Sequence, residues 1–224
     1  MNAPAATLRR DVDALLRAKG TFAPESATVP WRALVAILVL AGSFYGATMG
    51  SYGVRGTQAL YAALKVPVLL VLATVICVPN FFVVNTLLGL RDDFAAAFRG
   101  VVAAQATVAV VLAALAPVTA FAYVSGIDYD VARLFNGGVF AVAAGAGQVL
   151  LLRHYRVLIA RDPRHRVGRA AWLGLYCFVA IQLAWVLRPF IGAPGLPTSF
   201  FRRDAWTNAY VFLWDLATGT LTGR

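Results

Sequence analysis

The chain has 224 residues, of which 60% are hydrophobic and 13% are charged, and its mean hydropathy is +0.73. This composition excludes an ordinary soluble domain and indicates an integral membrane protein. The net charge of +10 comes mainly from arginines in short blocks between apolar runs, a distribution typical of membrane flanks and lipid-headgroup contacts, so we expect no nucleic-acid partner.

Residues 1–30 are predicted to form a cytosolic N-terminal segment. Charged residues interrupt every apolar stretch in it, so it lacks the core of a signal peptide and we expect it to be retained. Leu8, Val12 and Leu15 recur at helical spacing, which predicts a short amphipathic helix. This helix lies either on the membrane surface or against the bundle; the alternative is a docking site for a soluble partner.

Five uncharged apolar runs follow within residues 31–187, and each is long enough to cross a hydrocarbon layer of ~30 Å as a helix. We therefore predict an all-α integral membrane protein, a bundle of five transmembrane helices. Lys65 is interpreted as a flanking charge just before the second run. The runs cover residues 33–54, 66–90, 100–124, 134–152 and 170–187.

A glycine ridge in the first run is the most specific packing motif of the chain. Gly42, Gly46 and Gly50 follow one another at a spacing of four residues, as in a glycine zipper, so another helix can approach closely. The ridge serves either packing within the bundle or, alternatively, an oligomer interface or a glycine-lined path.

Lysines and arginines predict the orientation, because they favour the cytosolic side. They concentrate beside the N-terminus and in residues 153–169, which predicts a cytosolic N-terminus and an outer C-terminus in a bacterial-type plasma (inner) membrane. One interpretation of this basic block is a loop whose charges fix the orientation of the protein in the membrane. Alternatively, the block contacts anionic lipid headgroups or an acidic partner. Its histidines, His154 and His165, are expected to be solvated. Its arginines are Arg153, Arg156, Arg161, Arg164, Arg166 and Arg169.

Amides are the main polar groups inside the predicted spans. Asn85, Gln105 and Gln148 all fall in the cytosolic third of their helices, so we expect them to meet. A network of interhelical hydrogen bonds and a polar substrate vestibule are the two interpretations. No charge lies between the predicted flanks.

Residues 188–224 are predicted to form an outer-face hairpin followed by an interfacial helix. The first part is rich in proline and glycine, and the helical spacing of apolar residues begins at Trp206. Arg188 lies on the same predicted side as Asp128 and Asp130. We expect an outer ion pair between them, the alternative being a substrate-binding arginine.

The sequence shows no catalytic motif, no metal-ligand spacing and no cofactor fingerprint, and Cys77 and Cys177 lie singly in apolar runs. We therefore expect a non-enzymatic membrane protein without metal or cofactor, acting as a structural, anchoring or assembly subunit of a larger membrane complex. Its partners would be the lipid bilayer with anionic headgroups, and other membrane subunits or further copies of itself. The alternative is a small transporter or channel subunit that uses the intramembrane amides.

Overall fold

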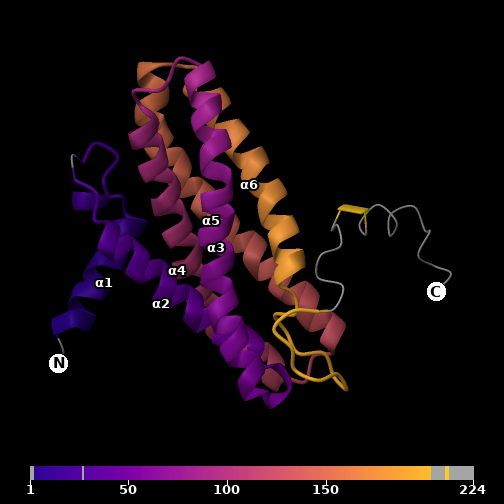
Figure 1. Cartoon of the computed structure of the whole chain (residues 1–224). Coiled ribbons are helices and arrows are strands. Elements are labelled where there is room, and N and C mark those ends of the chain that lie inside the picture. The colour runs from indigo at the N-terminus through magenta and orange to yellow at the C-terminus, as the bar shows by residue number, and fades with distance from the viewer. Residues whose placement is uncertain (1–2, 27, 203–209, 212–224) are drawn as a thin grey trace.

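The computed structural model describes residues 3–26, 28–202 and 210–211, and the described chain is almost entirely helical (Figure 1). Five of the helices, α2 to α6, are long and apolar enough to cross a membrane, which confirms the predicted number of candidate spans for this part of the chain. The elements are α1 (Ala3–Leu16), η1 (Gly20–Phe22), α2 (Trp31–Gly50), η2 (Tyr52–Val54), α3 (Gly56–Leu87), α4 (Phe94–Val124), α5 (Tyr129–Arg161) and α6 (His165–Leu187).

Helices α3 to α6 are longer than the uncharged runs in the sequence, whereas α2 ends at Gly50, before the end of its run. Helices α3, α4 and α5 contain 32, 31 and 33 residues, or roughly 48 Å at ~1.5 Å per residue, which exceeds a hydrocarbon layer of ~30 Å. A helix satisfies its own backbone hydrogen bonds, so it continues through charged residues where their side chains find partners. The predicted boundary at Lys65 is therefore wrong, because this lysine lies inside α3.

The bundle is built around α2, which packs against both α3 and α4, while α6 packs on α3 and α5 packs on α4. At the top of Figure 1 lie the turns that join α3 to α4 and α5 to α6. We call this the basic end. The turns after α2 and α4, together with residues 188–202, which we call the post-α6 segment, form the opposite end.

The glycine ridge of α2 faces α3 of the same chain. A Cβ atom on Gly46 would lie 2.3 Å from the Ala62 carbonyl oxygen, and one on Gly50 would lie 2.6 Å from the Gln58 carbonyl oxygen. A Cβ on Gly42 would meet Pro67 at 3.5 Å, an ordinary contact. Gly46 and Gly50 thus permit backbone contact between α2 and α3. Because α3 covers this ridge, a contact with another subunit would use a different face.

A buried hydrogen-bond network joins α2, α4 and α5. The Tyr45 hydroxyl donates to the Asn136 side-chain oxygen at 2.7 Å, and the Asn136 amide donates to the Tyr123 hydroxyl at 2.7 Å. Tyr45 and Asn136 are at most 1% exposed. Because these polar groups satisfy one another, the network stabilises one relative placement of three helices.

The predicted N-terminal helix is present as α1, which begins before Leu8 and packs against α2 and α4. Leu15 is fully buried in the core, as one of the two predicted placements requires. The predicted interfacial helix from Trp206 onward falls on residues outside the described chain, apart from Tyr210 and Val211.

Candidate functional site

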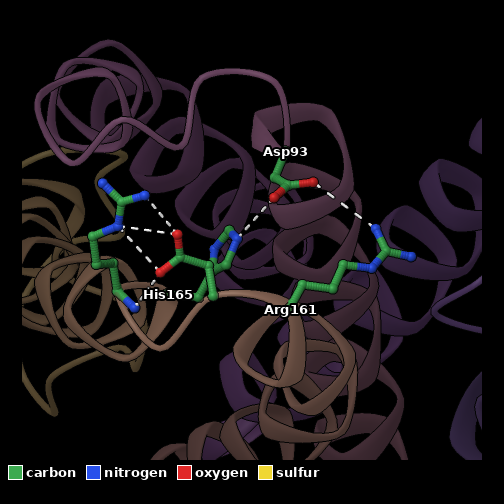
Figure 2. Close-up of polar contacts among 5 residues, drawn as sticks. Asp93, Arg161 and His165 are labelled. Carbon is green, nitrogen blue, oxygen red and sulfur yellow. Dashed lines mark hydrogen bonds and ion pairs between the residues drawn. The ribbon is translucent and has the colours of Figure 1, made fainter.

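Polar side chains from distant parts of the chain meet at the basic end (Figure 2). Asp93 lies in the turn before α4, and its carboxylate is 3.0 Å from Nε2 of His165, the first residue of α6. The Arg161 guanidinium at the end of α5 approaches the same carboxylate at 3.9 Å. Asp93 therefore connects the two turns that close this end of the bundle.

Both histidines of the basic block are buried, so the expectation of solvated histidines is wrong. His154 is 4% exposed and His165 is 0% exposed. The Nδ1 atom of His154 lies 3.1 Å from the Leu150 carbonyl oxygen, which can only accept, so Nδ1–H is the donor. Local spacing could not show the partner of His165, because Asp93 lies 72 positions away in the sequence.

The short connection between α5 and α6 is held by its own ion pair. Arg164 donates hydrogen bonds to both oxygens of Asp162, the shortest at 2.6 Å. The backbone N–H of Arg164 also donates to Asp162. These contacts favour the carboxylate form and lower the pKa of Asp162 to about 2.

Most of the predicted basic loop is helix. Arg153, Arg156 and Arg161 lie on α5, and Arg166 and Arg169 lie on α6. Arg153 donates to the Leu16 carbonyl oxygen at 3.2 Å and so contacts the end of α1. Part of this block therefore binds other segments of the same chain, while Arg156 and Arg166 are exposed.

A polar cavity of about 90 Å³ lies beside Asp93 at the basic end. The N-terminal segment, α4 and α5 form its walls. Arg99 on α4 donates a hydrogen bond to the Ser26 carbonyl oxygen, which holds the N-terminal segment over the cavity. The lining residues are Pro24, Glu25, Ala96, Arg99, His154, Val157, Leu158 and Arg161.

Two of the three predicted intramembrane amides, Asn85 and Gln105, make side-chain hydrogen bonds, and these go to different helices. The Asn85 amide donates to the Phe81 carbonyl oxygen of its own helix at 2.8 Å. The Gln105 side-chain oxygen accepts from the Tyr176 hydroxyl at 2.9 Å, which joins α4 to α6. The side-chain oxygens of Asn85 and Gln148 are buried without a hydrogen-bond partner. A shared network or vestibule thus stays a prediction.

At the opposite end, α3 holds the post-α6 segment. The Lys65 ammonium donates to the Pro189 carbonyl oxygen at 2.8 Å, and the Gln58 amide donates to the same oxygen at 2.8 Å and to the Phe190 carbonyl oxygen at 3.1 Å. Both side chains are fully buried. The Lys65 nitrogen also lies 4.7 Å from the centre of the Phe200 ring, a cation–π contact.

The residues of the predicted outer ion pair have other neighbours as well. Asp130 pairs with Arg133 one helical turn later at 3.1 Å, and Asp128 is the residue that precedes α5. The Arg188 guanidinium lies 3.3 Å from the centre of the Trp185 ring. The ion pair between Arg188 and these aspartates remains a prediction.

The polar groups at both ends mainly bind backbone carbonyls and carboxylates of this chain. Among the described residues, no group of three or more His, Cys, Asp or Glu side chains is placed to hold a metal ion. Local sequence patterns do not reveal the Lys65 site, the Asp93–His165 pair or the Asn136 network, because each joins residues that are far apart in the chain. Comparisons with protein-family models, with curated proteins and with solved structures find no match to this chain, so its function is inferred from the residues described above.

Proposed function

We propose that the chain is a non-enzymatic multi-pass membrane protein that serves as a structural, anchoring or assembly subunit of a larger membrane complex. One observation carries the proposal: buried polar side chains at both ends hold distant segments of the same chain. At the basic end, His165 contacts Asp93. At the opposite end, Lys65 and Gln58 bind the post-α6 segment. Such groups stabilise a fixed shape, which suits a scaffold.

The proposed orientation places the basic end in the cytosol of a bacterial-type cell and the opposite end outside. The support is the concentration of arginines at the basic end, together with the preference of lysine and arginine for cytosolic loops. Exposed arginines such as Arg156 and Arg166 would contact anionic lipid headgroups there.

Partner contacts would use the outer faces of α5 and α6. A Cβ atom on Gly145 of α5 or on Gly174 of α6 would meet no other atom within 4 Å, so a larger side chain fits there without disturbing the bundle. In the most apolar stretch of α6, 11% of the residues are buried, against 33 to 56% in the other candidate spans. Helix α6 therefore has the largest face left for a neighbour.

The test is purification of the tagged chain from its native membrane in a mild detergent, followed by mass spectrometry. We expect partner subunits, or further copies of the chain, in fixed stoichiometry. Gly174→Leu and Gly145→Leu should each leave the chain folded, and the one that faces the partner should release it. A monodisperse monomer without partners would refute the proposal.

A transporter or channel subunit is the second candidate, and it is favoured by the unpartnered side-chain oxygens of Asn85 and Gln148. An oxygen buried in a membrane without a hydrogen-bond partner costs free energy. Binding of a polar solute would supply the missing partner and explain why these oxygens are present. Liposomes that contain this chain alone should then transport a solute. Replacing Asn85, Gln105 and Gln148 with leucine should abolish that flux, and absence of flux in the unmodified chain would exclude this candidate.

A further inference from the structure

The polar cavity at the basic end has walls suited to an anion. Arg99 and Arg161 both line it, and so does the buried ring of His154. Glu25 is the one carboxylate among the lining residues. Two guanidinium groups therefore face one carboxylate, and the remaining charge of this lining is positive.

Both arginines retain hydrogen-bonding capacity for a ligand. The Nε atom of Arg99 is buried and has no hydrogen-bond partner, although one of its terminal nitrogens donates to Ser26. Arg161 contacts Asp93 at 3.9 Å, which is longer than a hydrogen bond, and its side chain is 62% exposed. A guanidinium group offers parallel N–H donors that match two oxygens of a phosphate.

The position of the cavity along the bundle indicates the source of the phosphate. Arg99 follows Phe98, whose ring lies 5.9 Å from the ring of Trp31 at the start of α2. Tryptophan at the end of a membrane-spanning helix prefers the headgroup level. The cavity is thus at the depth where the phosphate groups of the lipids would lie in the proposed orientation.

We propose that this cavity binds the phosphate group of an anionic phospholipid, with Arg99 and Arg161 as the ligands. Arg99 also holds the N-terminal segment at Ser26, so a bound headgroup would bridge this segment to α4 and α5. The inference depends on membrane insertion with the basic end at a lipid surface. It does not depend on a protein partner and would stand if the chain were a monomer.

The experiment measures lipid retention by the purified full-length chain. The protein is exchanged into detergent with phosphatidylglycerol, and native mass spectrometry counts the lipids that remain bound. We expect one tightly held phosphatidylglycerol in the unmodified chain. Arg161→Gln should weaken its retention roughly fivefold, the effect of losing one cation near a phosphate, while Arg161→Lys should weaken it less. Arg133→Gln is the matched control, because Arg133 is about as exposed as Arg161 and also contacts an aspartate, but lies at the opposite end and not in the cavity lining.

A gain of affinity separates binding from folding defects. Glu25→Gln removes the carboxylate from the cavity, so it should strengthen retention of phosphatidylglycerol, and a misfolded variant could not do so. Equal lipid retention in Arg161→Gln and Arg133→Gln would overturn the proposal. So would weaker retention in Glu25→Gln.

A second arm distinguishes lipid from free phosphate. The melting temperature is measured with inorganic phosphate, with chloride at equal ionic strength, and with phosphatidylglycerol. Stabilisation by the lipid that Arg161→Gln removes supports the proposal. Stabilisation by inorganic phosphate without any effect of the lipid would overturn the lipid source.

Discussion

At the basic end, Asp93 meets a histidine and an arginine, and the Arg161 and Arg164 side chains of this region are more than half exposed. At the opposite end, the Lys65 ammonium is fully buried and binds a carbonyl oxygen and an aromatic ring. The exposed cations thus meet carboxylates, whereas the described neighbours of the buried cation are dipoles and ring faces. A buried cation needs its partners more, because water cannot replace them.

The largest effect is expected from removing Lys65. Lys65→Ala leaves a cavity and takes a donor from the Pro189 carbonyl oxygen, so we expect the free energy of unfolding to fall by about 3 kcal/mol. Lys65→Met keeps the side-chain volume but removes the charge, so it should lower the free energy of unfolding by only about 1 kcal/mol. Thermal unfolding in detergent measures both. Equal losses in the two variants would show that the ammonium, rather than the side-chain volume, stabilises this end.

A smaller effect is expected at the basic end from removing His165. His165→Ala deletes the hydrogen bond to a carboxylate that is only 33% exposed, which should lower the free energy of unfolding by about 2 kcal/mol. His165→Gln keeps a donor and should lose less. Thermal unfolding under the same conditions gives the comparison. If His165→Ala costs more than Lys65→Ala, the contrast between the two ends is reversed.

The Asp162–Arg164 pair should respond to pH. Arg164 lowers the pKa of Asp162 from 3.8 to about 2. The pair therefore contributes fully to stability above pH 3.8, and this contribution is lost as the pH falls towards 2. Arg164→Gln should raise the pKa of Asp162 towards 3.8, which carboxyl NMR of aspartate-labelled protein measures. An unchanged pKa would show that the arginine side chain does not stabilise the carboxylate.

The smallest effect is expected at the exposed Asp130–Arg133 pair of the opposite end. Both side chains are more than half exposed, and water screens their attraction. Arg133→Gln should change the free energy of unfolding by less than about 0.5 kcal/mol. It is therefore a control for Lys65→Met at the same end. If Arg133→Gln lowered the free energy of unfolding as much as Lys65→Met does, solvent exposure would not explain the difference between Arg133 and Lys65.

The sequence was sufficient for the number of candidate spans, because each is a long apolar run, but not for their ends. The sequence predicts a helix boundary at Lys65, because a charge is costly in hydrocarbon. Its partners at Pro189 and Phe200 cannot be seen in its local sequence. The basic block likewise reads as a loop, although its arginines continue α5 and begin α6.

The candidate site was less predictable than the fold. The basic block from Arg153 to Arg169 stands out in the sequence by its charge, and one of its arginines, Arg161, lines the polar cavity. The sequence does not show that Arg99 and Glu25 line the same cavity as Arg161, because three separate segments form the walls of this cavity. His165 shows the same limit, since its partner Asp93 comes from another turn of the chain.

The Lys65 contact also has a consequence for synthesis of the protein. Pro189 follows Lys65 by 124 residues, so helix α3 is made long before the carbonyl that its lysine binds. At ~5–20 residues per second, this interval lasts roughly 6 to 25 s. During that time the ammonium group needs water, lipid phosphate or the insertion machinery as a temporary partner. A chain that stops after α6 would leave this ammonium group without the carbonyl oxygen and the aromatic ring that bind it.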